Sequence, residues 1–205
     1  MQTNFNESRT KLNLMRAFAG ESQSRMRYYL AAVTAQQQFM VGIERMFRFT
    51  AEQEEHHAKV FFELLKDAAG EEIPIKADFP ADVYTDLQQL LDAAAKGEDK
   101  EFSEIYPEFA RVAAEEGFTD IGEKFRMIAE IEDKHKHRFQ YYADLMRKDM
   151  LFRSDDTEEK WMCLNCGHIH TGSEPPQQCP VCAVKQGFYV REPEAPFTSC
   201  NIMKA

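Results

Sequence analysis

Glu54-Glu55-His56-His57 and Glu132-Asp133-Lys134-His135 each place a glutamate three residues before a histidine. Residues i and i+3 lie on one face of an α-helix. On either side of each pair, the steps of three and four are mostly apolar, from Ile43 to Leu64 and from Ile121 to Met146. Each pair therefore interrupts the stripe that a helical bundle buries. Because a buried charge without a partner is too costly to persist, these side chains need partners, and a metal ion would satisfy them together.

Two further segments with a helical pattern carry acids on the same kind of apolar face. Glu21 lies on the stripe from Leu14 to Tyr28. Glu98 and Glu101 lie on the stripe from Leu87 to Ile105. One glutamate from each of two helices and a Glu-x-x-His pair from each of the other two form the ligand set of carboxylate-bridged dimetal bundles, and here one helix adds an extra acid. The alternative, two solvated ion pairs on exposed faces, leaves the matched acids unexplained. The candidate ligands are Glu21, Glu54, His57, Glu98, Glu101, Glu132 and His135.

The same periodicity predicts four long helices, at about 8–38, 42–69, 80–117 and 119–150. Gly70 should end the second helix, and Thr119 is the expected N-cap of the fourth. Pro107 should kink the third helix because it lacks a backbone N–H. The connector Glu71–Pro80 reaches only ~35 Å when extended, whereas a helix of about 27 residues is ~40 Å long. An up-down bundle and a crossover bundle therefore both remain open.

Four of the five cysteines form two Cys-x-x-Cys units, Cys163-Leu164-Asn165-Cys166 and Cys179-Pro180-Val181-Cys182. Two such knuckles can place four thiolates around one tetrahedral site, which selects zinc or iron. Taken alone, the spacing favours structural zinc, whereas its fusion to a dimetal bundle favours iron. A domain this small has too little core to fold without its metal. The chain thus divides into a bundle at 1–152, a charged linker at 153–160, a metal-knuckle domain at 161–191 and a tail at 192–205.

The composition excludes several classes of partner. With 35 acidic and 25 basic residues, the net charge of −10 argues against nucleic acids and anionic membranes. No apolar run approaches the ~18 residues that span a bilayer, and the polar N-terminus has no secretory core. Paired cysteines that serve as metal ligands are typical of a reducing cytoplasm. We expect His168 and His170 at the surface, Cys200 as a free thiol, and a poorly ordered tail.

A set of short motifs occurs in a fixed order along the chain and spans nearly all of residues 8–190. These are Ala19-Gly20-Glu21-Ser22-Gln23-Ser24-Arg25, Glu54-x-x-His57, Glu98-x-x-Glu101, Tyr106-Pro107, Glu132-x-x-His135 and the two Cys-x-x-Cys units. Together they resemble the rubrerythrin family. The resemblance implies a mainly α protein, with a ferritin-like four-helix bundle that holds two irons. A small rubredoxin-like domain with one iron on four cysteines would follow the bundle.

The resemblance also implies a role for each candidate ligand. Glu54 and Glu132 would bridge the two irons. Glu21 would bind one iron only, and Glu98 with His135 would bind the other.

The remaining site residues are those to which the resemblance gives a catalytic role. Glu101 and His57 would exchange on the first iron as its oxidation state changes. Tyr28 and Tyr106 would lie beside the ligand carboxylates, although spacing alone also allows Tyr28 an ordinary core position. The third iron would be held by Cys163, Cys166, Cys179 and Cys182.

The function that this resemblance implies is that of a cytoplasmic peroxidase that reduces hydrogen peroxide to water in oxidative-stress defence. Electrons would come from an external NAD(P)H-linked reductase or a rubredoxin, because the chain has no Gly-x-Gly-x-x-Gly run to bind a nicotinamide itself. The expected working unit is a head-to-tail homodimer, because the cysteine domain would have to fold back along its own bundle to approach the dimetal site, and the short charged linker offers little means of holding it there. Two alternatives remain, a ferroxidase or iron-storage protein and a non-enzymatic zinc-ribbon interaction protein.

Overall fold

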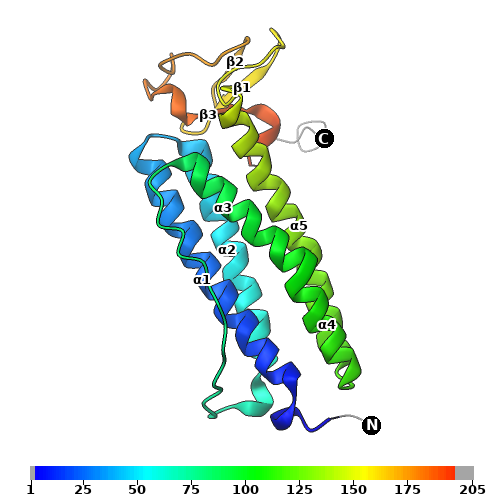
Figure 1. The fold of residues 1–205 in the computed structure, drawn as a ribbon. Helices are drawn as coiled ribbons and strands as arrows, with labels where there is room; N and C mark the ends of the chain where they lie inside the picture. Colours follow the sequence, from blue (N-terminus) through cyan, green and yellow to red (C-terminus); the bar gives the residue numbers. More distant parts are fainter. Residues whose placement is uncertain (1–2, 197–205) are drawn as a thin grey trace.

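The computed structural model describes residues 3–196 and shows a four-helix bundle with a small three-stranded domain at one end (Figure 1). Helices α1 (Arg9–Gln37) and α2 (Val41–Glu63) form the first antiparallel hairpin. The short 3₁₀ helix η1 (Phe5–Glu7) precedes α1. The Ser8 hydroxyl caps α1 by accepting a hydrogen bond from the Lys11 amide at 3.0 Å. The predicted fold class, mainly α with a ferritin-like bundle, is confirmed.

The third helix of the bundle consists of three segments. These are α3 (Leu87–Lys100), a π-helical turn η3 (Glu101–Ile105) and α4 (Tyr106–Glu115). Pro107 cannot donate the backbone hydrogen bond that a regular helix needs, and the wider π turn directly before α4 accommodates this. The expected kink therefore takes the form of a π-helical turn that begins at Glu101. Helix α5 (Thr119–Arg147) returns antiparallel to this composite helix.

Several predicted helix boundaries are wrong. The third helix begins at Leu87 and not after Pro80, because the Asp86 side chain accepts a hydrogen bond from the Gln89 amide at 2.9 Å and caps the helix there. Thr119 is the first residue of α5 and not its N-cap. Helix α2 ends at Glu63 and not near residue 69. Part of the segment that was predicted to continue it forms the separate 3₁₀ helix η2 (Lys66–Ala68), before Gly70.

The late start of α3 decides the topology. The connector at 69–86 runs along α1 from one end of the bundle to the other (Figure 1). A chain of this length reaches ~60 Å when extended, more than the ~35 Å length of the 23-residue α2. Helices α2 and α3 can therefore run in the same direction, which makes this a crossover bundle. An ion pair between Arg27 and Asp82, at 2.9 Å, holds the connector against α1.

Two aromatic clusters fill the bundle above and below its midpoint. One contains Tyr28, Phe47 and Phe139, with ring centroids 4.9 to 6.1 Å apart. The other contains Phe61, Tyr106 and Phe125, with centroids 5.0 to 5.9 Å apart. The buried acids and histidines of the predicted site lie between these two apolar layers, so water has little access to them from the bundle ends.

The cysteine domain is a small antiparallel sheet of order β2-β1-β3. Its strands are β1 (Lys160–Cys163), β2 (Ile169–Thr171) and β3 (Tyr189–Arg191), with the 3₁₀ helix η4 (Gln186–Phe188) before β3. Trp161 is completely buried in its core, where its indole N–H donates to the Gly172 carbonyl at 2.8 Å. Strand β1 begins where the predicted linker ends.

The cysteine domain has contacts with its own bundle, but at the end of the bundle and not alongside it. The domain packs on the end of its own bundle, where Arg191 donates hydrogen bonds to the carbonyls of Met150 and Arg153 at 2.8 and 2.7 Å. Gly187 lies so close to the α1–α2 turn that a Cβ atom there would be 1.9 Å from the carbonyl oxygen of Phe39. The Lys185 ammonium sits over the Phe39 ring, 4.4 Å from its centroid.

The first residues of the predicted loose tail are ordered. They form the 3₁₀ helix η5 (Glu192–Glu194), and Ala195 is buried. Tyr141 and Tyr142 of α5 both donate hydrogen bonds to the Glu194 carboxylate. Cys200 lies outside the described residues. Between residues 3 and 196, no helix has the length and apolar character required to cross a membrane.

Candidate metal centres

Six buried side chains from all four helices of the bundle meet at its midpoint. They form two overlapping groups, in each of which the ligand atoms lie within 4.8 Å of one another. The first group is Glu21, Glu54, His57 and Glu132, and the second is Glu54, Glu98, Glu132 and His135. Glu54 and Glu132 belong to both groups. This is the arrangement of two adjacent metal positions with two shared carboxylates.

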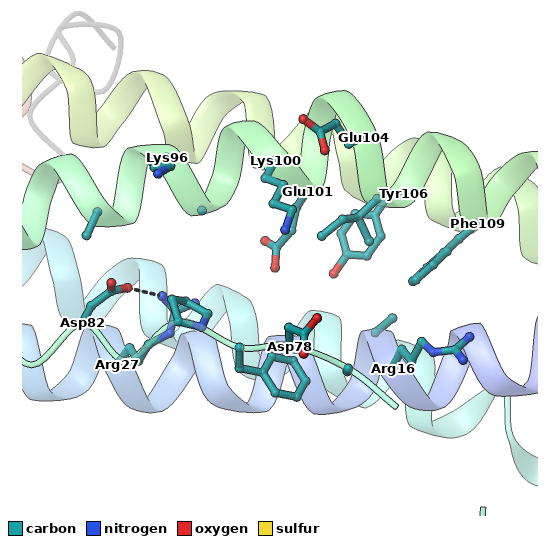
Figure 2. A pocket seen from close by; sticks show the side chains of 18 of the residues that line it. Arg16, Arg27, Asp78, Asp82, Lys96, Lys100, Glu101, Glu104, Tyr106 and Phe109 are labelled. Carbon is teal, nitrogen blue, oxygen red and sulfur yellow. Dashed lines mark hydrogen bonds and ion pairs between the residues drawn. The ribbon is translucent and has the colours of Figure 1, made fainter. Parts of the chain in front are cut away.

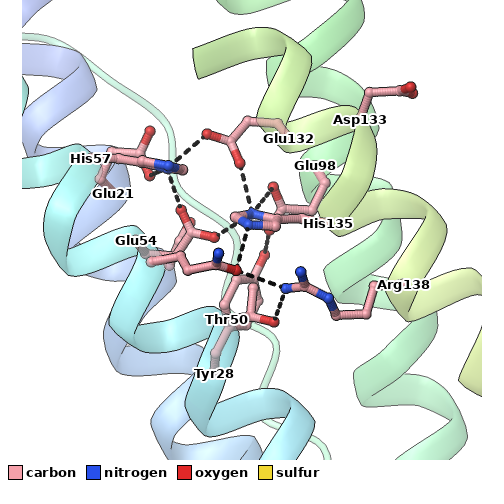
Figure 3. A network of polar contacts seen from close by, with 12 residues as sticks. Glu21, Tyr28, Thr50, Glu54, His57, Glu98, Glu132, Asp133, His135 and Arg138 are labelled. Atoms are coloured by element: carbon pink, nitrogen blue, oxygen red, sulfur yellow. Dashed lines mark hydrogen bonds and ion pairs between the residues drawn. The ribbon is translucent and has the colours of Figure 1, made fainter. Parts of the chain in front are cut away.

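Each shared carboxylate directs one oxygen to each histidine (Figure 3). The oxygens of Glu54 lie 3.2 Å from Nδ1 of His57 and 2.8 Å from Nδ1 of His135. Those of Glu132 lie 2.9 Å and 2.8 Å from the same two nitrogens. The two imidazole rings are nearly parallel, with centroids 5.6 Å apart. Both histidines therefore turn the same ring nitrogen to the centre, as two ligands of a dimetal pair would.

Among the described residues, several buried atoms at this centre form no regular hydrogen bond and have only the close contacts that its acids and histidines make with one another. They are Glu21 Oε2, Glu54 Oε1, Glu98 Oε2, both carboxylate oxygens of Glu132 and His135 Nδ1. An unsatisfied buried polar group costs about 1–3 kcal/mol, and more when it is charged. Two cations between the shared carboxylates would satisfy these atoms together. Carboxylate oxygen with imidazole nitrogen suits divalent iron, manganese or zinc, so this donor set fits a metal pair.

Without a metal, the same centre retains protons. Burial and the charge of Glu54 raise the pKa of Glu21 to about 8. Burial lowers the pKa of His135, but its contacts with Glu132, Glu54 and Glu98 outweigh this and raise that pKa to about 11. An incoming metal must displace these protons, so its affinity should increase with pH.

Two buried tyrosines each donate a hydrogen bond to one of the unshared carboxylates. Tyr28 donates to Glu98, and Tyr106 donates to Glu21. Burial, followed by the charge of the neighbouring glutamate, raises the pKa of each phenol well above its usual value. Both tyrosines therefore keep their protons and fix the unshared carboxylates. Tyr28 also packs against Phe139, so the core position and the polar contact occur together.

Glu101 belongs to neither group. It lies at the inner side of a cleft of about 980 Å³ between α1, the connector and the α3–α4 helix, where Tyr106 is its neighbour (Figure 2). Burial and the charges of Glu21 and Glu98 raise its pKa well above the usual range. His57, and not Glu101, occupies the first group. Of the two residues expected to exchange, the structure thus has the histidine at the centre and the glutamate facing the cleft.

The four knuckle cysteines converge in the small domain. Their sulfurs lie within 4.8 Å of one another, with Cys163 and Cys182 3.8 Å apart and Cys166 and Cys179 3.6 Å apart. Backbone N–H groups of Gly167 and Ala183 close the two knuckles by donating to the carbonyls of the first cysteine of each. His168 and His170 are half-buried and are not members of this group. Four thiolates at this separation fit one tetrahedral metal ion.

Comparison with known proteins agrees with this architecture. Residues 13–143 match the family model described as Rubrerythrin, and residues 161–190 match the model for the rubredoxin-like domain of rubrerythrin. The chain belongs to the rubrerythrin family. Rubrerythrin homologues are oxidoreductases. Like them, this chain has a helical bundle with a dimetal carboxylate cluster and a rubredoxin-like domain with four clustered cysteines.

Individual rubrerythrins align over almost the whole chain. The protein "Rubrerythrin" of Clostridium perfringens is 42% identical over 183 residues, which cover 89% of this chain and 93% of that protein. Rubrerythrin of Nitratidesulfovibrio vulgaris is also 42% identical, over 86% of this chain and 90% of its own length. Among solved structures, the fully reduced, all-ferrous state of nigerythrin superposes with a TM-score of 0.60 at 28% identity, covering 92% of both chains.

Beside the rubrerythrin ligand set lies a polar group that the sequence did not predict. Nε2 of His135 lies 3.1 Å from Oε1 of Gln53, and Arg138 donates a hydrogen bond to the same oxygen at 2.9 Å. Arg138 also donates to the Thr50 hydroxyl at 2.9 Å. Arg138 does continue the i, i+3 series Glu132, His135 on α5. That signal is weak, because a charged residue next to an apolar seam is usually solvated.

Proposed function

We propose that this chain is a non-haem di-iron peroxidase that reduces hydrogen peroxide to two waters with two electrons and two protons. The observation that carries the proposal is the pair of buried carboxylates, Glu54 and Glu132, each directed at both His57 and His135. Shared carboxylates hold two metal ions close enough to react with one substrate molecule. The family relationship supports iron as the metal.

Each half of the site would hold one iron. Glu21 and His57 would bind the first, and Glu98 and His135 the second, with Glu54 and Glu132 between them. When bound in its reduced form, the iron pair supplies both electrons at once, so that no hydroxyl radical is released. The anionic oxygens keep the total charge of the loaded centre low, which reduces the cost of burying it.

The cleft beside Glu101 offers a route for peroxide to the first iron position (Figure 2). Because burial and the neighbouring carboxylates raise its pKa, the Glu101 carboxyl group keeps its proton to a higher pH than an exposed glutamate does. That proton is available to the oxygen that leaves as water, which is general acid catalysis. Once deprotonated, Glu101 can take the place of His57 as a ligand. Tyr106 holds Glu21 in position while these two side chains exchange.

The cysteine domain would hold one iron and pass single electrons to the bundle. Part of each knuckle is open to the surface, since Cys166 is exposed and Val181, between Cys179 and Cys182, is 67% exposed. An external NAD(P)H-linked reductase or a rubredoxin could approach this surface. The proposal applies to a reducing compartment such as the cytoplasm, because the four thiolates must stay reduced to hold the metal.

A head-to-tail homodimer is part of this proposal. Helix α5 continues for about twelve residues beyond His135, so its own cysteine domain lies more than ~18 Å from the dimetal centre along the helix. Contacts of Arg191 and Gly187 hold the domain at that end, away from its own dimetal centre. A partner chain in the opposite orientation could bring its cysteine domain nearer to this centre.

A mixed dimer tests the crossing of electrons between chains. One chain carries Cys163→Ser and the other Glu132→Ala, so that only one intact pair of sites forms, across the interface. Peroxide reduction at about half the wild-type rate is expected if electrons cross. A mixed dimer without activity would show that each chain supplies its own electrons.

Rapid mixing of the reduced, iron-loaded protein with hydrogen peroxide tests the function itself. We expect one peroxide consumed for every two electrons, and the red colour of the oxidised iron–cysteine site should return as electrons leave it. Uptake of iron well beyond about three ions per chain, without consumption of peroxide, would instead indicate iron storage. A colourless, zinc-filled cysteine site with no turnover would favour a non-enzymatic role.

A further inference from the structure

The ring nitrogen of His135 that faces away from the metal positions is held by a chain of contacts behind the site (Figure 3). His135 Nε2 lies 3.1 Å from the side-chain oxygen of Gln53. The guanidinium of Arg138 donates to that same oxygen and to the Thr50 hydroxyl, each at 2.9 Å. The ring of Phe49 covers the guanidinium, 5.1 Å away. Three contacts, to Gln53, Thr50 and Phe49, thus hold the Arg138 guanidinium in place.

This chain of contacts determines which nitrogen of His135 keeps a hydrogen. A guanidinium can only donate hydrogen bonds, so it can bind the oxygen of Gln53 but not its NH₂ group. With the amide fixed in this orientation, the group that faces His135 Nε2 is an acceptor. In the neutral ring that binds a metal, Nε2 must therefore carry the hydrogen, and Nδ1 has the free lone pair.

We propose that Arg138, acting through Gln53, is a positioning residue that sets the metal-binding tautomer of His135. Nδ1 then faces Glu54 and Glu132 at 2.8 Å each, where the second metal would sit. Without Arg138, the Gln53 amide could turn and offer its NH₂ group to Nε2. The hydrogen would then be favoured on Nδ1, which blocks ligation. The inference rests on the proposed function only in that the centre binds metal.

The other histidine lacks such a support. Across residues 3–196, His57 has contacts through Nδ1 to Glu21, Glu54 and Glu132, but no hydrogen bond to its Nε2. His57 is also the histidine that is expected to leave its metal in exchange for Glu101. The centre thus has one histidine fixed through its outer nitrogen and one that is free to move, and Arg138 makes the difference.

A double-variant experiment separates tautomer control from charge or packing. Arg138→Met lets the Gln53 amide turn, and should weaken binding at one of the two metal positions by about 10- to 100-fold. Gln53→Glu offers only acceptor oxygens, so it should bind metal within a few-fold of the wild type. Combined, Arg138→Met with Gln53→Glu should recover the affinity, because a carboxylate cannot present a donor to Nε2. Arg147→Met, an exposed arginine on the same helix, is the control and should change nothing.

The measurement is a Co²⁺ titration of the metal-free chain, with helicity recorded alongside. A ¹⁵N spectrum of the Zn²⁺-loaded wild type should show the hydrogen of His135 on Nε2. The inference is overturned if Arg138→Met binds both ions as tightly as the wild type, or if the double variant stays as weak as Arg138→Met. Should Arg138→Met lose helicity, Gln53→Met carries the test, and unchanged binding by it would also overturn the inference. If the chain binds two Co²⁺ ions as expected but does not reduce peroxide when it is loaded with iron, only the proposed function is refuted.

Discussion

Glu54 on α2 and Glu132 on α5 face each other at the middle of the bundle, and each turns one oxygen to each of two histidine nitrogens at 2.8 to 3.2 Å. Loss of either residue would therefore open both metal positions. Loss of an unshared ligand such as Glu21 would open only one. This difference distinguishes a bridged pair from two independent sites.

Glu101→Ala should separate metal binding from turnover. Because His57 already occupies the first position, the reduced chain should keep both irons of the bundle. Peroxide reduction should fall by about 10²- to 10⁴-fold, since the variant lacks the proton donor at the cleft. Iron content and steady-state rate check this, with Glu115→Ala, an exposed glutamate of α4 outside the cleft lining, as the control. Iron loss as complete as that of a Glu132 variant would contradict the proposed exchange.

Cys163→Ser should remove the red colour of the oxidised cysteine site and leave the bundle folded. The two domains have separate cores, so the loss of one metal should not unfold the helices. Visible absorption and far-ultraviolet circular dichroism check this, and Cys200→Ser is the control outside the knuckles. A parallel loss of helicity would mean that the two cores are not independent.

The stability of the metal-free protein should decrease as the pH rises from about 6 to 9. The pKa values of Glu21 and His135 are raised from 4.5 to about 8 and from 6.5 to about 11. A group whose pKa is higher in the folded than in the unfolded state stabilises the fold at any pH below its unfolded-state pKa. This stabilisation is about 1.4 kcal/mol for each unit between the two pKa values, and it is lost as the pH rises through the folded-state pKa.

Metal reverses this dependence, because it replaces the protons and binds more tightly as they leave. The Zn²⁺-loaded chain should therefore gain in Tm over the same range in which the metal-free chain loses. Thermal denaturation at several pH values with and without Zn²⁺ measures both. A metal-free Tm that rises from pH 6 to pH 9 would contradict the burial of protonated carboxyl groups.

Gly187→Ala should release the cysteine domain from the end of the bundle. Its new Cβ would overlap the backbone carbonyl of Phe39, which cannot move without opening the α1–α2 turn. Proteolysis within 153–160 should become faster, while both domains stay folded. Gly97→Ala is the matched control, because the Cβ it would add meets no described atom within 4 Å other than those of its chain neighbours and its own helix backbone. An unchanged cleavage rate would show that the contact does not hold the domain.

The sequence was most informative where chemistry and periodicity coincide. Glu54, His57, Glu132 and His135 could be placed at the centre because acids and histidines in an apolar seam are costly to bury unless they share a partner such as a metal ion. The four cysteines were equally predictable from their spacing. The start of α3 was not, because Pro80 is a good first-turn residue and the competing cap at Asp86 becomes decisive only when Leu87 and Leu91 find their core positions.

Long-range contacts could not be predicted from the sequence. Nothing local indicates that Gly187 would meet Phe39, because a glycine needed for close approach looks like any other loop glycine. The contact between Gln53 and Arg138 joins α2 to α5, and it depends on the relative rotation of these two helices. The π-helical turn at Glu101 is a local feature, but its form was not predictable either, because Pro107 indicates an irregularity without specifying it.

The most direct test of a bridged dimetal centre is the iron content and peroxide turnover of Glu132→Ala beside Glu130→Ala. Glu130 is an exposed glutamate on the same helix, so it controls for the loss of an acid from α5. Because Glu132 contacts both metal positions, Glu132→Ala should lose both bundle irons and all measurable turnover, while its cysteine site stays red. Glu130→Ala should match the wild type. A Glu132→Ala chain that keeps one bundle iron tightly bound, or that still reduces peroxide at the wild-type rate, would contradict the bridging role.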